Sequence, residues 1–362
     1  MVSELFLKIC RNLTIISAAG ILSACVSTQD KFEFTMPTTN PAAVAPIVWP
    51  EPPLQAHYQY IGDLRGESNK IKSSEEKKSG FERFFSSLVG LDSEYIPLLD
   101  LLRPQHGVVD KNGRIYVTDP GLQAVFVFDE VTGEFFIWNE KKLDIPFLSP
   151  VGIALTETSV LVADSEQGLI FEFDLNGSLI KTFGKETLQR PTGIAYDPEQ
   201  KRILVCDTQQ DNIHVFSLQG NPIKVIGSKG SKIGEFNRPT FITYKNNKLY
   251  VSDSLNARIQ VFNSKDEPVN SIGQRGLYVG NFTRPKGVAV DSDGNIYVSE
   301  SYYDHLLIFN SVGEFLLSIG GSGNQPGTFA QPTGIWTDNK DRVFVSDMLN
   351  SRISIFQYLG DN

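Results

Sequence analysis

The sequence contains little cysteine, little histidine and a deficit of positive charge. Its 362 residues include three cysteines and four histidines, and 33 basic residues stand against 42 acidic ones. Cys10, Cys25 and Cys206 are too few and too far apart for a disulfide-rich domain or a zinc knuckle. The net charge of −9 argues against nucleic acid as a partner, because duplex binding depends on lysine and arginine that neutralise phosphates.

The apolar run near the N-terminus is too short to cross a membrane. It extends from Leu13 to Ala24 and has 12 residues, whereas a helix that spans a bilayer needs about 20. It follows Lys8 and Arg11 in the sequence. This order of basic and apolar residues predicts a signal peptide over residues 1–24.

The run ends in Leu22-Ser23-Ala24-Cys25, which resembles the lipobox of bacterial lipoproteins. The resemblance implies that Cys25 becomes the N-terminal residue, carries acyl chains such as palmitate, and anchors the chain in a membrane. Val26 at the next position resembles lipoproteins that are passed to the outer membrane of the bacterial cell envelope. The alternative is an ordinary signal peptide with an incidental cysteine.

Residues 25–53 are expected to form the lipidated cysteine and an extended tether, because they contain six prolines and no periodic pattern. With Cys10 removed and Cys25 acylated, Cys206 has no cysteine to pair with. We therefore expect no disulfide in the mature chain and no disulfide-linked partner.

A repeat of 41–48 residues organises the rest of the chain. Each of six units has a small residue that introduces an aliphatic strand: Gly107, Gly152, Gly193, Gly287 and Gly334, with Phe241 in the remaining unit. Each then has a β-rich run that ends in an acid: Asp119, Asp164, Asp207, Asp253, Glu300 and Asp347. A phenylalanine follows nine residues after every one of these acids.

This pattern predicts four antiparallel strands per unit and an all-β, six-bladed β-propeller over residues 101–362, because no unit has a helical period. The last unit lacks a fourth strand, since the chain ends too soon after Phe356. Residues 54–62 end in the same Ile-Gly pair that closes other units. We therefore expect them to form the outer strand of blade six and to close the ring.

The repeat can be compared with a known family. Arg190-Pro191-Thr192-Gly193-Ile194, and the segment over residues 251–262 (VSDSLNARIQVF), resemble NHL repeats. With the lipobox and the lead-in over residues 49–53, the chain is similar to bacterial NHL-repeat lipoproteins. The resemblance implies a propeller that binds a ligand or a protein, although some relatives are enzymes.

Residues 63–100 fall outside the repeat. They begin with a charged stretch and continue with apolar residues at helical spacing: Phe81, Phe84, Phe85, Leu88 and Val89. This predicts a short amphipathic helix inserted between the closing strand and the first blade. It would cover one end of the propeller or, alternatively, dock on a membrane or a partner.

Two sets of loops are expected to open on the same face of the propeller, because antiparallel strands alternate in direction. One set carries four arginines, each before a proline: Arg103, Arg190, Arg238 and Arg284. Their guanidinium groups would bind a carboxylate or phosphate. The residue before each repeat glycine should ring the channel mouth on this face, which gives His106, Thr192, Thr240, Lys286 and Thr333 as further binding candidates. The strand-end acids of the second set, joined by Arg258 and Arg352, are interpreted as structural.

No catalytic or metal site can be assembled from the sequence. Peptidyl-amidoglycolate lyases, which also have propellers similar to NHL domains, hold zinc with three central histidines, but only His106 has such a place here. Four acids that resemble calcium ligands end their strands on the opposite face and are interpreted as turn formers: Asp110, Asp197, Asp291 and Asp338. Cys206 lies in a β-rich run and is expected to be buried packing.

The sequence therefore predicts an exported, lipid-anchored NHL propeller that serves as a platform for an envelope protein or a small ligand. No cofactor, metal or catalytic residue is assigned. The alternative is a propeller enzyme, a lyase or hydrolase, with a metal or anion site at the channel mouth.

Overall fold

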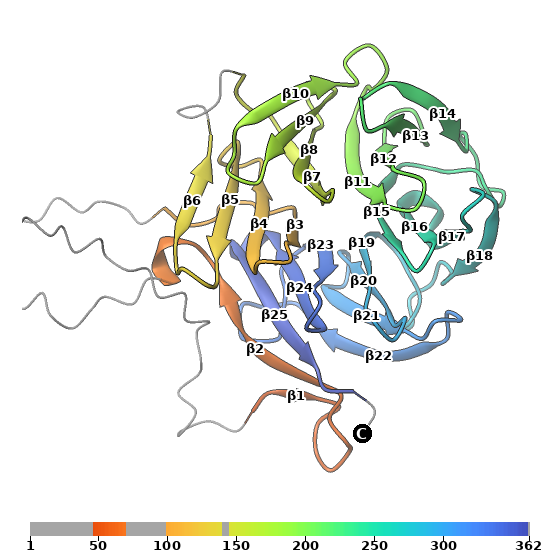
Figure 1. The fold of residues 1–362 in the computed structure, drawn as a ribbon. Coiled ribbons are helices and arrows are strands. Elements are labelled where there is room, and N and C mark those ends of the chain that lie inside the picture. The colour runs from red at the N-terminus through yellow and green to blue at the C-terminus, as the bar shows by residue number, and fades with distance from the viewer. Residues whose placement is uncertain (1–45, 70–98, 140–144, 361–362) are drawn as a thin grey trace, which may run out of the picture. The chain divides into compact units, whose positions relative to one another are not determined.

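The computed structural model describes residues 46–69, 99–139 and 145–360. Their strands form six antiparallel sheets arranged as blades around a central axis (Figure 1). Each inner strand lies against the inner strands of the two neighbouring blades, so the blades close into a ring. No helix in these ranges is long and apolar enough to cross a bilayer.

The first three blades each contain four strands in chain order. Blade 1 contains β3 (His106–Val109), β4 (Arg114–Asp119), β5 (Ala124–Asp129) and β6 (Phe135–Trp138). Blade 2 contains β7 (Pro150–Leu155), β8 (Ser159–Asp164), β9 (Leu169–Asp174) and β10 (Leu179–Phe183). Blade 3 contains β11 (Pro191–Asp197), β12 (Arg202–Asp207), β13 (Asn212–Ser217) and β14 (Pro222–Ile226).

Blades 4 and 5 repeat this order. Blade 4 contains β15 (Pro239–Lys245), β16 (Lys248–Asp253), β17 (Arg258–Phe262) and β18 (Pro268–Ile272). Blade 5 contains β19 (Pro285–Val290), β20 (Ile296–Glu300), β21 (His305–Phe309) and β22 (Phe315–Gly320). Three short 3₁₀ turns complete the regular elements of the described residues: η1 (Glu67–Asn69), η2 (Ser254–Asn256) and η3 (Met348–Asn350).

Blade 6 joins the two ends of the propeller sequence. It contains β23 (Pro332–Thr337), β24 (Arg342–Asp347), β25 (Arg352–Tyr358) and then β2 (Tyr58–Leu64), which is antiparallel to β25. The predicted closing strand is thus present. The structure adds a fifth strand, β1 (Val48–Trp49), outside β2, so two residues assigned to the tether belong to the sheet.

The core lies between the faces of neighbouring blades. The phenylalanine that follows each strand-end acid by nine residues is at most 2% exposed in all six blades: Phe128, Phe173, Phe216, Phe262, Phe309 and Phe356. Near the axis, glycine lets the inner strands approach one another. A Cβ atom on Gly193 would lie 2.7 Å from the Cα atom of Phe241 in the next blade, closer than side-chain packing allows.

Three parts of the sequence-based prediction lie outside the described residues. They are the signal peptide of residues 1–24, the lipidated Cys25 with most of its tether, and the amphipathic helix around Phe81–Val89. The signal peptide, the lipidated cysteine with its tether, and the amphipathic helix therefore stay predictions, as do their boundaries.

Candidate functional site

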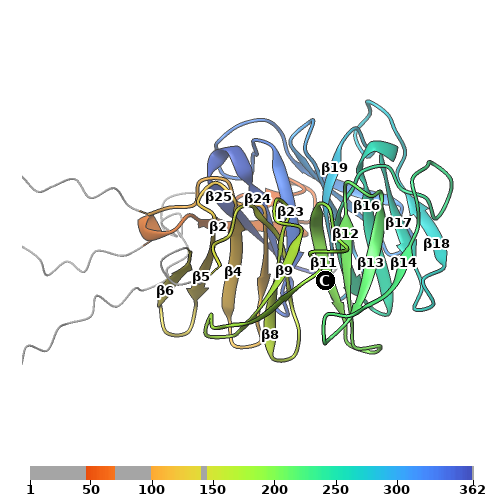
Figure 2. The same cartoon turned by 90° about the horizontal axis from the view of Figure 1, so that it is seen from above.

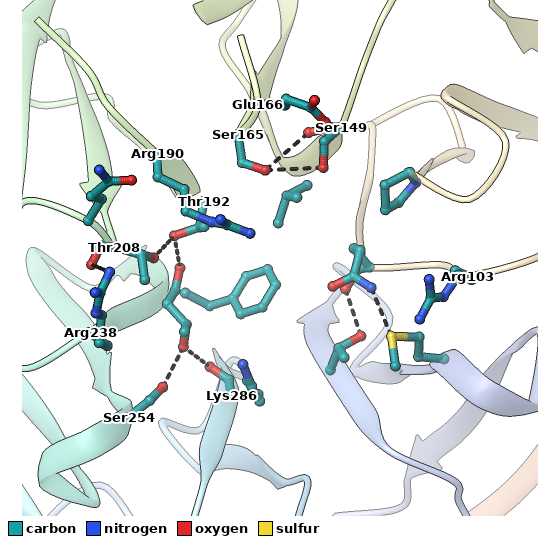
Figure 3. Close-up of a pocket in the computed structure, with 18 of the residues that line it drawn as sticks. Arg103, Ser149, Ser165, Glu166, Arg190, Thr192, Thr208, Arg238, Ser254 and Lys286 are labelled. Atoms are coloured by element: carbon teal, nitrogen blue, oxygen red, sulfur yellow. Dashed lines mark hydrogen bonds between the residues drawn. The ribbon is translucent and has the colours of Figure 1, made fainter. Parts of the chain in front are cut away.

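One end of the ring opens into a cavity of about 980 Å³. Its wall is built by the loops that precede the inner strands and by the loops that join the second and third strands of each blade. Eight of the nine predicted binding residues line it: Arg103, Arg190, Arg238, Arg284, Thr192, Thr240, Lys286 and Thr333. Figure 3 shows Arg190, Arg238 and Lys286 together on one side, with Glu166 on another and Arg103 apart.

The four cavity arginines differ from five other arginines in the described part of the chain. Those five are held by acidic partners in ion pairs of 2.5–2.9 Å: Arg114, Arg202, Arg258, Arg342 and Arg352. The four cavity arginines are exposed, and the described part of the chain offers none of them a carboxylate within salt-bridge distance. Glu166 is the one acid among the described residues that line the cavity. The cavity is therefore cationic, although the chain carries a net charge of −9.

Buried acids hold the backbone of the cavity arginines. The Asp119 carboxylate accepts hydrogen bonds from the backbone N–H of Leu102 at 2.6 Å and of Arg103 at 3.0 Å. Asp207 binds the backbone N–H of Arg190 in the same way, at 3.1 Å. The strand-end acids thus have the structural role that the sequence suggested, because their lone pairs fix the loops that present the guanidinium groups.

Blade 5 follows the same arrangement and blade 4 departs from it. Glu300 accepts the backbone N–H of Arg284 at 2.9 Å. The Arg238 N–H instead reaches Asp211 of the preceding blade at 2.7 Å, and Arg238 adopts a left-handed backbone with φ of 54°. Asp253 binds the N–H of the preceding residue, Asn237. Blade 4 therefore presents its arginine from a different backbone geometry.

Lys286 is the most enclosed cation of the cavity. Burial lowers the pKa of its ammonium group, and the positive charges of Arg284 and Arg190 lower that pKa further. The structure therefore places three like charges close enough to repel one another. A bound anion would relieve this repulsion and raise the pKa of Lys286 again.

The cavity threonines already use their hydroxyl groups to connect blades. The Thr192 hydroxyl donates to the carbonyl of Thr240 at 2.7 Å, and the Thr240 hydroxyl donates to the carbonyl of Lys286 at 3.2 Å. The Thr333 hydroxyl donates to the carbonyl of Gln105 at 3.1 Å. These side chains line the wall, and their main contribution is to hold the inner strands in register around the ring.

His106 does not line the cavity, contrary to the prediction. Blade 1 has one residue more between proline and glycine (Arg103-Pro104-Gln105-His106-Gly107) than the Arg-Pro-Thr-Gly segment of blade 3. Gln105 consequently occupies the place of the threonines and lines the cavity. His106 occupies the place that a glycine fills in four other blades, and it is 6% exposed.

His106 and Phe241 form a floor under the cavity. They are the two large residues at the six glycine positions, they come from opposite blades, and their rings lie 5.2 Å apart. The edge of Trp336 packs on His106 from blade 6, at 5.9 Å. Below this floor is a separate chamber of about 230 Å³, lined by His106 and Trp336. Burial lowers the pKa of His106 to about 4, so its ring is uncharged near neutral pH.

The other candidate groups lie apart from one another. Among residues 46–69, 99–139 and 145–360, no three histidine, cysteine or acidic side chains are placed to hold a metal ion. Asp110 accepts the backbone N–H groups of Asn112 and Arg114, and Asp338 makes the equivalent bonds in blade 6, as turn formers do. Cys206 is buried, and burial raises the pKa of its thiol.

Sequence reasoning missed several cavity residues, among them Gln105, Ser165, Glu166, Leu255 and Met348. Aligning the units on their Arg-Pro pairs rather than on glycine would have identified Gln105 and excluded His106. Glu166 and Leu255 follow strand-end acids in the loops that join second and third strands. Nothing in a single sequence marked them as different from ordinary turn residues.

Comparison with known proteins agrees with the fold. A family described as NHL repeat matches residues 236–262, and a family described as 6-bladed beta-propeller matches residues 290–360. The sequence matches none of the curated proteins with which it was compared.

Solved structures share the architecture at low sequence identity. Virginiamycin B lyase from Staphylococcus aureus is 15% identical, with 72% of this chain and 97% of that chain covered and a TM-score of 0.52. An auxiliary nutrient binding protein from Bacteroides ovatus is 12% identical, with 71% and 69% covered and a TM-score of 0.55. A chain of the nidogen/laminin complex is 17% identical, with 61% and 83% covered and a TM-score of 0.50. With six blades in the structure and both families matched within them, the chain is a six-bladed β-propeller of the NHL-repeat type.

Proposed function

We propose that this protein is a lipid-anchored binding platform of the bacterial cell envelope whose cavity takes an anionic group of a ligand or partner. The observation that carries the proposal is a set of cations that have no carboxylate partner among the described residues. Four arginines and Lys286 line one cavity, and the described residues around them supply a single acid, Glu166. Carboxylate and phosphate are the groups that guanidinium recognises through paired hydrogen bonds.

The form of the site supports a ligand larger than a simple ion. A volume of about 980 Å³ lies at the upper end of the range for small-molecule sites, roughly 300–1,000 Å³. Apolar side chains lie beside the cations, with Phe241 at the floor and Val151 and Leu255 in the wall. The ligand we envisage therefore combines an anionic group with an apolar part.

Among the structural neighbours, the auxiliary nutrient binding protein from Bacteroides ovatus is a binding protein, whereas virginiamycin B lyase is an enzyme. For a lyase, the cavity would have to supply a group that moves protons. His106 is part of the floor, and it lines the lower chamber instead of the cavity. These positions favour the binding platform.

The envelope location is part of the proposal and rests on Leu22-Ser23-Ala24-Cys25. It predicts that cells fed an alkyne analogue of palmitate label the wild-type chain and leave a Cys25→Ser variant unlabelled. The labelled chain should fractionate with outer membranes. A chain that is exported without label would contradict the anchor and leave the cavity proposal untouched.

The anion site can be tested by calorimetry on the full chain carrying Cys25→Ser. Inorganic phosphate and citrate serve as separate probes. An Arg190→Gln/Arg284→Gln double variant should lower the affinity for a bound probe by about tenfold or more, because it removes charged hydrogen-bond donors. Lys111→Gln is the matched control, since Lys111 is an exposed cation in the turn at the far end of β3.

Two results would overturn the anion site. One is an affinity of the double variant equal to that of its parent. The other is the absence of binding by both probes to the parent protein at low ionic strength, where cationic sites are least screened.

A further inference from the structure

Three loops on the cavity face share one backbone design. They cover residues 228–236, 274–282 and 321–329 and lead to the inner strands of blades 4, 5 and 6. In each loop the phenylalanine at the end donates its N–H to the carbonyl of the first residue, as Phe282 does to Gln274 at 2.9 Å. In each loop a glycine also donates to the carbonyl of that phenylalanine, as Gly276 does to Phe282 at 3.2 Å.

The tips of these equivalent loops differ in chemistry. Residues 231–233 are Ser-Lys-Ile and residues 324–326 are Asn-Gln-Pro, whereas residues 277–279 are Leu-Tyr-Val. Leu277, Tyr278 and Val279 are 80%, 84% and 65% exposed. The other two tips have the same hydrogen bonds with mostly polar residues, so the loop fold does not require an apolar tip. The three side chains remain in water without a structural reason.

The apolar tip stands beside positive charge. Residues 273–286 contain Arg275, Arg284 and Lys286 and no acidic residue. The Arg275 Nη2 atom donates to the carbonyl of Leu255 at 2.6 Å, and Leu255 lines the cavity. The loop is therefore fixed at the cavity rim. Figure 2 shows that the connections between blades extend past the strand ends on one side of the ring.

We propose that the Leu277–Val279 tip inserts into the surface of an anionic lipid bilayer, with Arg275 beside it against the headgroups. An apolar loop flanked by cations is suited to the bilayer interface, because acyl chains accept the aliphatic residues and the headgroup region accepts tyrosine. Anionic headgroups attract the cations. The proposal goes beyond anion binding in the cavity and does not depend on it.

A lipid surface accounts for this tip better than a protein does. The tip is a convex projection of three residues, and a protein contact of ordinary size needs a broader surface of about 800 Å² per partner. A bilayer needs no complementary groove, and it accepts a single projecting loop. The lipobox of this chain would also keep the propeller within reach of a membrane surface.

The first test measures insertion at the tip itself. The full chain with Cys10→Ser and Cys25→Ser keeps only the buried Cys206, which does not compete for labelling in the folded protein. Tyr278→Cys and, separately, Gln325→Cys at the equivalent position of the next loop are labelled with an environment-sensitive fluorophore. Vesicles of phosphatidylglycerol and phosphatidylcholine should shift the emission at position 278 to the blue and leave position 325 unchanged. Vesicles of phosphatidylcholine alone should have a much smaller effect.

The second test replaces the tip with a sequence that this fold already accepts. A Leu277→Asn/Tyr278→Gln/Val279→Pro variant carries the tip of the next loop without a change in charge, and Arg275→Gln removes the flanking cation. The triple variant should lower partition into the anionic vesicles by about tenfold or more, because three apolar side chains no longer leave water. Arg275→Gln should lower it by a few-fold in a salt-dependent manner.

The outcomes separate the alternatives. Equal emission changes at positions 278 and 325, or none at 278, would overturn insertion of the tip. Unchanged partition of the triple variant would assign vesicle binding to another part of the chain and would equally overturn the proposal. Calorimetry with phosphate is a separate measurement, so loss of the cavity site and loss of tip insertion can be told apart.

Discussion

The closure of the ring depends on a buried ion pair between Asp63 in β2 and Arg352 in β25. Arg352 is 1% exposed, and its Nη1 atom lies 2.9 Å from Asp63 Oδ2. Asp63 Oδ1 also accepts the hydroxyl of Ser354 at 3.0 Å. Asp63→Ala would leave this hydroxyl without its acceptor and would remove one of the two partners of Arg352 Nη1, which keeps the carbonyl of Asn324 at 3.2 Å.

The loss of unfolding free energy in Asp63→Ala depends on the contacts that Arg352 keeps. Breaking a buried ion pair by removing one partner costs about 3–5 kcal/mol. Arg352 keeps its 2.7 Å ion pair with Asp347 and its hydrogen bonds to the carbonyls of Gln325 and Thr328. We therefore expect the lower end of that range, a loss of about 3 kcal/mol in the free energy of unfolding.

Urea denaturation followed by tryptophan fluorescence measures this loss. Asp63→Asn should cost less, because the amide keeps the size of the side chain and one acceptor oxygen. The exposed Asp293→Ala is the control and should change the free energy by no more than about 0.5 kcal/mol. A loss below about 1 kcal/mol for Asp63→Ala, or one equal to that of Asp293→Ala, would refute the view that this pair secures the ring.

Three further predictions concern the axis and the cavity. Burial lowers the pKa of His106 to about 4, from about 6.5 in the unfolded chain, so acidification from pH 6.5 to 4 should remove about 3 kcal/mol of stability through this residue. In urea titrations across pH, His106→Gln should lose less stability over this interval than the wild type by about that amount. Anion affinity should fall as the pH rises toward the lowered pKa of Lys286, because the neutral amine attracts anions poorly; calorimetry across pH should find a flatter profile for Lys286→Arg. Phe241→Ala should cost about 3–5 kcal/mol in thermal or urea unfolding, and a loss below about 1 kcal/mol would contradict a packed floor.

Most strands of the propeller and most of its core residues can be predicted from the sequence. Alternating aliphatic runs predict the strands, and the fixed interval from each acid to its phenylalanine predicts which residues face the core. The closing strand was also predictable, because the last unit lacks one strand and Ile61-Gly62 supplies the missing pattern. The short β1 was hidden, since a two-residue strand among prolines has no period to detect.

The cavity was predictable in part. Loop direction in antiparallel blades places Arg103, Arg190, Arg238 and Arg284 at one mouth, and the structure brings them together there. The place of His106 was wrong because one additional residue in blade 1 shifts the inner strand relative to the repeat, and a shift by one residue turns a side chain to the other side of a strand. The exposed tip at Leu277–Val279 could be singled out only after the three loops were known to share a backbone.

Because His106 and Phe241 form its floor, the cavity has one opening, at the end of the ring that carries the arginines. A ligand that enters past the arginines must leave by the same route, so its residence time depends on how the rim and Lys286 release it and not on transit through the ring. Molecules at the opposite end meet a different chamber, lined by His106 and Trp336, and do not compete for the cationic one. The central channel of the propeller is thus divided into two compartments that open at opposite ends of the ring.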